Sequence, residues 1–136
     1  MKEEDKLAMI HHYRTKARHF LSQADEMMEL KHWDLAVNRY YYACFHIVQS
    51  LFVCNGLSAH THSGTLSQFT LHFVKTNLVP IDFGGFFSKM VQLRQKADYN
   101  NVANISEEEA RSIVGMSHSF FEIVESLIGE LGENNV

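Results

Sequence analysis

The residues with the clearest potential for chemistry are an arginine and a histidine set in an otherwise apolar stretch. Arg39 and His46 belong to the run Asn38-Arg39-Tyr40-Tyr41-Tyr42-Ala43-Cys44-Phe45-His46. Their spacing is close to two helical turns, so both side chains leave a helix on one face. Either Arg39 pairs with a carboxylate and His46 bonds a backbone carbonyl, or the two residues form a site.

A second polar group lies later in the chain, where Arg94 follows the apolar stripe of a predicted helix. A core-facing arginine requires a partner, because an unpaired buried charge is very costly. Asp98 stands one helical turn further on, within reach of Arg94, and Tyr99 follows it. The ion pair would either tie this helix to an earlier one or hold a functional groove together.

Histidines supply a third group, in the segment His60-Thr61-His62. Two loop histidines could bind a metal, but no cysteine or carboxylate close in sequence completes a ligand set, so we expect no metal site. His11, His12 and His19 are predicted to be solvated surface residues. The chain lacks a glycine-rich phosphate loop, a Gly-x-Ser-x-Gly elbow, a His-Glu-x-x-His motif and a Cys-x-x-Cys motif. Nothing in these patterns predicts a cofactor.

The composition is that of an ordinary globular protein. The 136 residues are 46% apolar and 21% charged, which predicts one domain over residues 1–136 with its core at about 5–131. The net charge of −4 excludes a global basic field for nucleic acid, but not a local basic stripe. No apolar run is long enough to span a membrane. The charged N-terminus and two cysteines interpreted as reduced core thiols, Cys44 and Cys54, predict a cytoplasmic protein.

Hydrophobic periodicity predicts five helical segments, at about 4–30, 34–55, 63–77, 83–99 and 107–131. Asp34 is the expected N-cap of the second helix, and Ser106 with Glu109 matches a capping box before the last one. The second helix is apolar around most of its circumference, which marks it as central. Its polar residues fall in one sector: Asn38, Arg39, the Tyr42 hydroxyl, His46, Gln49 and Ser50. The predicted fold class is all-α, a four- to five-helix up-and-down bundle.

Three stretches resemble motifs of the HEPN superfamily, in particular its small bacterial and archaeal branch. Segment 33–46 is similar to the stretch A-x-N-R-x-Y-Y-A-x-F-H, Thr61-His62-Ser63-Gly64 to the loop T-H-S-G, and segment 94–99 to the signature R-x-x-A-D-Y. They occur in the expected order, and the resemblance covers residues 10–130 or so. It implies a helical bundle, often dimeric, commonly encoded beside a minimal nucleotidyltransferase as a two-protein module resembling toxin and antitoxin.

The resemblance also implies an activity. Many HEPN proteins are metal-independent RNases with an Arg-x(4–6)-His motif, in which the histidine acts as acid or base at the ribose 2′-OH and the arginine stabilises the phosphate. Arg39 and His46 fit that spacing. However, the family motif usually has a polar residue after the arginine, where this chain has Tyr40, and it usually belongs to the later helix. There Asp98 replaces the histidine, and an ionised aspartate is a poor general acid.

These observations leave three hypotheses. The first is a homodimeric HEPN protein that binds nucleotide or RNA and partners a nucleotidyltransferase in a toxin–antitoxin-like module. The second is an RNase toxin that uses Arg39 and His46 as its catalytic pair. The third is a purely structural helical interaction protein. In the first hypothesis, a polar groove between the second and fourth helices would include Asn38, Arg39, Tyr42, His46, His62, Arg94, Asp98 and Tyr99.

Overall fold

The computed structural model describes residues 2–99 and 105–134, and of residues 99 and 130–134 it describes the backbone alone. These residues form five α-helices and one π-helical turn, with no strand among them. The helices are α1 (Glu3–Glu29), α2 (Trp33–Cys54), α3 (His62–Phe69), α4 (Ile81–Tyr99) and α5 (Glu107–Asn134), and the π turn η1 (Thr70–Val74) extends α3. The predicted all-α bundle is confirmed.

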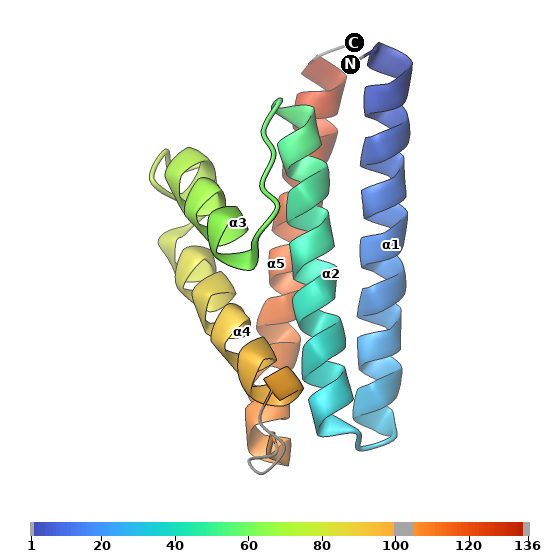
Figure 1. The fold of residues 1–136 in the computed structure, drawn as a ribbon, viewed down its shortest axis with the longest axis vertical. Helices are drawn as coiled ribbons and strands as arrows, with labels where there is room; N and C mark the ends of the chain where they lie inside the picture. Colours follow the sequence, from blue (N-terminus) through green and yellow to red (C-terminus); the bar gives the residue numbers. More distant parts are fainter. Residues whose placement is uncertain (1, 100–104, 135–136) are drawn as a thin grey trace.

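The helices are arranged around α2. Figure 1 shows α1, α2 and α5 as three long rods side by side, while the shorter α3 and α4 pack together along another side of α2. The start of α1 and the end of α5 lie at the same end of the bundle. Because α2 packs against all the other helices, nearly its whole surface must be apolar or find polar partners.

Aromatic side chains fill the space between α2 and its neighbours. The rings of Phe69, Phe87 and Phe120 come from α3, α4 and α5 and meet at centroid distances of 5.3–5.5 Å. All three are fully buried. Burying a side chain of this size contributes about 1.5–3 kcal/mol, so this cluster is a main source of cohesion between the α3–α4 pair and α5.

Of the two helix caps predicted from the sequence, one is formed by local hydrogen bonds and the other is replaced by a long-range hydrogen bond. The capping box is confirmed, since the Glu109 N–H donates to Ser106 Oγ over 3.1 Å and the Ser106 N–H donates to Glu109 Oε1 over 3.2 Å. The predicted N-cap Asp34 is wrong, because α2 begins at Trp33 and the N-cap position is His32. Asp34 instead accepts a hydrogen bond of 2.8 Å from the backbone N–H of Ile105, two residues before α5 begins.

The loop Thr61-His62-Ser63-Gly64 begins α3 in a way that requires its glycine. Thr61 is the N-cap, and its Oγ1 accepts a hydrogen bond of 2.9 Å from the Gly64 N–H. A Cβ at position 64 would lie 2.7 Å from that same Oγ1. The close approach excludes a larger residue without a shift of the cap, and it places His62 in the first turn of α3.

Two further expectations concern the burial of the cysteines and the presence of a membrane-spanning helix. Cys44 and Cys54 are both buried and unpaired, and burial raises the pKa of each, so both remain neutral thiols. Within the part of the chain that the structure describes, no helix is long and apolar enough to cross a membrane.

Replacing Asp34 with alanine should destabilise the protein by about 1–3 kcal/mol, because the Ile105 N–H would lose a charged acceptor. Asp82 provides the matched control. It also lies in the first turn of a helix, but it is exposed and accepts no hydrogen bond among the described residues. Asp82→Ala should cost only about 0.5 kcal/mol through the helix dipole. Equal shifts of the two variants in urea unfolding would refute this role for Asp34.

Candidate functional site

Polar side chains of α2 and α4 form a connected network where the two helices meet. Nη1 of Arg39 donates to Oδ1 of Asn38, and Nδ2 of Asn38 donates to Oδ1 of Asp98 over 3.0 Å. The second carboxylate oxygen, Oδ2, lies 3.1 Å from Nε of Arg94, one helical turn earlier. One carboxylate therefore joins α4 to α2, and the predicted pair of Arg94 with Asp98 is confirmed.

Arg94 is the buried member of this network. Its side chain is 8% exposed. The guanidinium carbon lies 5.8 Å from the ring centre of Tyr41 and 5.9 Å from that of Tyr42. Cation–π contacts and the carboxylate together replace the water that a buried guanidinium has lost. The guanidinium of Arg94 from α4 thus packs on the rings of Tyr41 and Tyr42, which are consecutive on α2.

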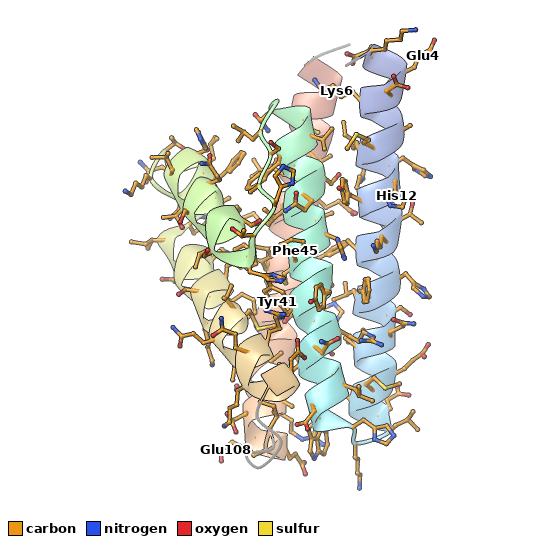
Figure 2. The ribbon with its side chains drawn as sticks, in the orientation of Figure 1. Glu4, Lys6, His12, Tyr41, Phe45 and Glu108 are labelled. Atoms are coloured by element: carbon orange, nitrogen blue, oxygen red, sulfur yellow. The ribbon has the colours of Figure 1, made fainter. Side chains whose placement is uncertain are left out.

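His62 reaches the same network from the first turn of α3. Its Nδ1 lies 2.6 Å from the hydroxyl of Tyr41, and its ring packs against Phe45 at 5.2 Å. Figure 2 shows Tyr41 and Phe45 on the side of α2 that faces α3 and α4. Burial raises the pKa of Tyr41, and burial together with the charge of Arg94 lowers the pKa of His62. Both groups are therefore neutral at pH 7.

The protonation of His62 follows from the hydroxyl beside it. The buried Tyr41 hydroxyl has Nδ1 as its one hydrogen-bond partner among the described residues. A buried hydroxyl that left its proton unused would lose a hydrogen bond, so it donates to Nδ1. The neutral imidazole then carries its own proton on Nε2. His62 is thereby prepared to donate a hydrogen bond from its half-exposed ring.

His46 lies within a stack of rings between α1 and α2. It is 9% exposed and packs on Phe20 at 5.3 Å, Tyr42 at 5.9 Å and Tyr13 at 6.3 Å, with interplanar angles below 30°. Burial, assisted by the positive charge of Lys16 on α1, lowers the pKa of His46 to about 4. Its Nδ1 is buried and has no hydrogen-bond partner among the described residues.

Arg39 and His46 do not contact each other through a hydrogen bond in the described structure. Both pack instead on Phe20 of α1, whose ring centre lies 5.6 Å from the guanidinium carbon of Arg39. Among the described residues, Arg39 makes no pair with a carboxylate and His46 makes no bond to a backbone carbonyl, the two structural contacts that the sequence allowed. Arg39 bonds the Asn38 amide rather than a carboxylate, and no carbonyl accepts a bond from Nδ1 of His46.

The structure brings most of the predicted site residues together. We define the polar cluster as Asn38, Arg39, Tyr42, His62, Arg94 and Asp98. His46 adjoins it through Tyr42, whereas the side chain of Tyr99 lies outside the described residues. The cluster presents guanidinium, amide and imidazole donors, a set suited to binding an anion such as phosphate. Across residues 2–99 and 105–134, no three His, Cys, Asp or Glu side chains converge as metal ligands.

Comparison with protein families now identifies the chain. The HEPN domain model matches residues 10–127, which is most of the sequence. The chain belongs to the HEPN family. The match spans all the helices that contribute to the polar cluster, so the cluster lies within the HEPN domain.

Three relatives span most of this HEPN protein. A "UPF0332 protein" from Thermotoga maritima is 34% identical over 96% of this chain and 98% of its own length. Two proteins from Methanocaldococcus jannaschii are named "Putative toxin MJ0142" and "Putative toxin MJ0605". The first is 30% identical over 77% of this chain and 71% of the relative, and the second is 33% identical over 82% of both.

Sequence reasoning missed the residues of α1 that surround His46. Tyr13 and Phe20 supply rings to the stack around His46, and Lys16 and His12 lie near enough to lower its pKa. Tyr13 and Phe20 stand two helical turns apart, so the spacing of aromatic residues on one face could have revealed them. The side of α2 that they cover could not be read from the sequence.

Replacing His46 with phenylalanine should make folding less sensitive to acid. The pKa of His46 is about 4 in the folded protein and 6.5 without burial, so between these values the unfolded chain binds an extra proton. The associated stability is present above pH 6.5 and is lost as the pH falls toward 4, with about 2 kcal/mol lost by pH 5. Phenylalanine removes this titration and keeps a ring in the stack.

Urea unfolding at pH 7 and pH 5 measures this difference. The wild type should lose more stability between the two values than His46→Phe does. His19→Phe, at an exposed position of α1, should behave as the wild type. The same loss in His46→Phe and wild type would show that His46 is not the group responsible.

Proposed function

We propose that this HEPN protein binds RNA through the polar cluster and acts as the toxin-like member of a two-protein module with a nucleotidyltransferase. The observation that carries the proposal is the network joining Arg39, Asn38, Asp98 and Arg94 across α2 and α4. It orients the half-exposed guanidinium of Arg39 and connects it, through Asn38 and Asp98, to the buried guanidinium of Arg94. That arrangement supports phosphate binding, because a planar guanidinium matches two phosphate oxygens at once.

Local charge supports an RNA backbone as the ligand. The chain as a whole is acidic, with a net charge of −4, so a polyanion requires a restricted basic region. Lys16 on α1 adds positive charge near His46, and Arg39 packs on the same Phe20 ring as His46. Contacts to phosphate are independent of sequence, and they make affinity depend on salt.

The geometry supports binding more strongly than cleavage by Arg39 and His46. A catalytic histidine must reach the proton it transfers, and its pKa should lie near the working pH. The ring of His46 is 9% exposed, is covered by Tyr13 and Phe20, and has a pKa of about 4. At pH 7 it is therefore neither charged as an acid nor open to a ribose.

The proposed biological role draws on the relatives as well. Two of them carry names that describe toxins, and the motif resemblance favours a homodimer encoded beside a nucleotidyltransferase. A homodimer would bring two polar clusters into one assembly and increase the local positive charge. RNA and a nucleotidyltransferase are both partners that a cytoplasmic protein can meet.

Arg39→Ala should weaken binding of a short single-stranded RNA about tenfold, because it removes a charge-assisted phosphate contact. The slope of log affinity against log salt should also fall by about one unit. Arg18→Ala is the matched control, since Arg18 is exposed and paired with Glu125 of α5. Fluorescence anisotropy at several salt concentrations measures both quantities. Equal effects of the two substitutions would exclude Arg39 from the RNA site.

Growth of bacteria that express the protein distinguishes an RNA-binding toxin from an RNase that uses His46. The wild-type protein should arrest growth, Arg39→Ala should relieve the arrest, and His46→Phe should not. Co-expression of the nucleotidyltransferase encoded beside it should restore growth to wild-type cells. Relief by His46→Phe, with folding intact by circular dichroism, would instead favour the RNase that uses Arg39 and His46.

A further inference from the structure

Most of α1 is basic, although the chain as a whole is acidic. Residues 6–24 contain four of the twelve lysine and arginine residues, three of the nine histidines and none of the sixteen aspartate and glutamate residues. The packing of α1 does not require this charge, because the residues that the helix buries are Ile10, Ala17 and Ala24. The basic side chains therefore lie outside the buried stripe of α1.

Three histidines and a lysine share one exposed part of this helix. His11, His12 (labelled in Figure 2), Lys16 and His19 are all exposed, and together with Thr15 they line an open hollow of about 380 Å³. At 100° per residue, His12, Lys16 and His19 fall in one sector about 60° wide. We call His11, His12, Lys16 and His19 the histidine face.

No carboxylate pairs with the histidine face among the described residues. Nε2 of His11 lies 3.5 Å from Oγ1 of Thr15, and the ring of His12 packs edge-on against Tyr13 at 5.6 Å. Neither contact supplies a negative charge. A proton taken up by one of these imidazoles therefore adds a positive charge that an external anion can contact.

The helices packed against α1 add no negative charge to this part of its surface within the described structure. Glu125 of α5 reaches α1, but it pairs with Arg14 and Arg18, which lie on the opposite side of α1 from Lys16 by the rule of 100° per residue. From α2, His46 lies close enough to Lys16 for the lysine to lower its pKa, and a pKa of about 4 keeps His46 neutral at pH 6.

The histidine face continues into the polar cluster. Phe20 stands one helical turn after Lys16, and its ring packs against the guanidinium of Arg39 at 5.6 Å. His12 and His19 are about 10 Å apart along the helix axis. A nucleic acid strand places more than one phosphate in that length. An RNA strand bound at Arg39 can therefore continue along α1.

We propose that the histidine face is a second phosphate-binding surface for RNA, and that its positive charge, and with it the affinity for RNA, increases as the pH falls below 7. The inference rests on the proposed RNA binding and adds its regulation. Histidine is the side chain that ordinarily changes its charge between pH 5 and 8. Lys16 is the one permanent charge of the face, and protonated imidazoles join it at lower pH. A bound phosphate favours the protonated imidazole, so RNA binding takes up protons.

Fluorescence anisotropy with a short oligouridine at pH 7.5 and pH 6 tests the inference, because uracil has no group that titrates in this range. The wild type should bind about tenfold more tightly at pH 6, and its slope of log affinity against log salt should become steeper by about one unit or more. The triple variant His11→Gln, His12→Gln, His19→Gln should lose most of this pH dependence and keep its affinity at pH 7.5.

Two further variants separate the histidine face from other histidines. His32→Gln with His60→Gln is the matched control, since both residues are exposed and lie outside α1. This control should keep the pH dependence of the wild type. His12→Lys with His19→Lys makes the charge permanent, so at pH 7.5 it should bind the oligouridine about as tightly as the wild type does at pH 6. All the substituted positions are exposed, and circular dichroism at both pH values checks the fold.

Equal affinity of the wild type for oligouridine at both pH values would overturn the inference, and so would an unchanged pH dependence in the triple variant. Neither result affects the proposed polar-cluster site, because Arg39→Ala tests that site at pH 7.5 alone. Absence of RNA binding by the wild type at both pH values would overturn the two proposals together. The two failures are therefore distinguishable with the same samples.

Discussion

A guanidinium buried inside the helical bundle organises the surrounding structure. Arg94 has left water, and the free energy of that transfer is tolerable only if charge and hydrogen-bonding partners surround it. Asp98 supplies the opposite charge, and Tyr41 and Tyr42 supply ring faces. Asn38 then satisfies the remaining carboxylate oxygen from α2. The packing of α4 on α2 and the position of the polar cluster both follow from this one charge.

The central helix α2 contacts several helices at once, and consecutive residues of α2 contact different ones. Tyr40 donates its hydroxyl to Asp25 of α1, Tyr41 donates to His62 of α3, and Tyr42 lies under Arg94 of α4. Successive residues on a helix point about 100° apart, so three adjacent tyrosines reach three different helices. The three tyrosine rings thus pack in the core, while the hydroxyl groups of Tyr40 and Tyr41 bond polar side chains of other helices. This accounts for an apolar helix that nonetheless holds a polar site.

A series of ring contacts runs along the interface between α1 and α2. Arg39 packs on Phe20, Phe20 on His46 and His46 on Tyr13. The rings exclude water from His46 and keep it neutral. His46 therefore has a clear physical role as an interior ring between α1 and α2.

The sequence by itself determined the features that depend on neighbours along the chain. Helical periodicity, the capping box of Ser106 and Glu109, and the pair of Arg94 with Asp98 all join residues within one turn of a helix. The motif resemblance also predicted the family correctly, because it rests on residue types and order. These features need no knowledge of how the helices pack.

Only the tertiary structure decided which distant residues meet. The sequence predicted Asp34 as a local cap, but the carboxylate bonds the Ile105 N–H, which lies beyond α3 and α4 along the chain. Similarly, the spacing of Arg39 and His46 predicted a shared face, and α1 then covered that face with Phe20 and Tyr13. Burial, pKa and access to a ligand depend on those long-range contacts. Residue spacing within one helix therefore indicated which polar residues share a face, while the packing of α1, α3 and α4 against α2 set their burial and their partners.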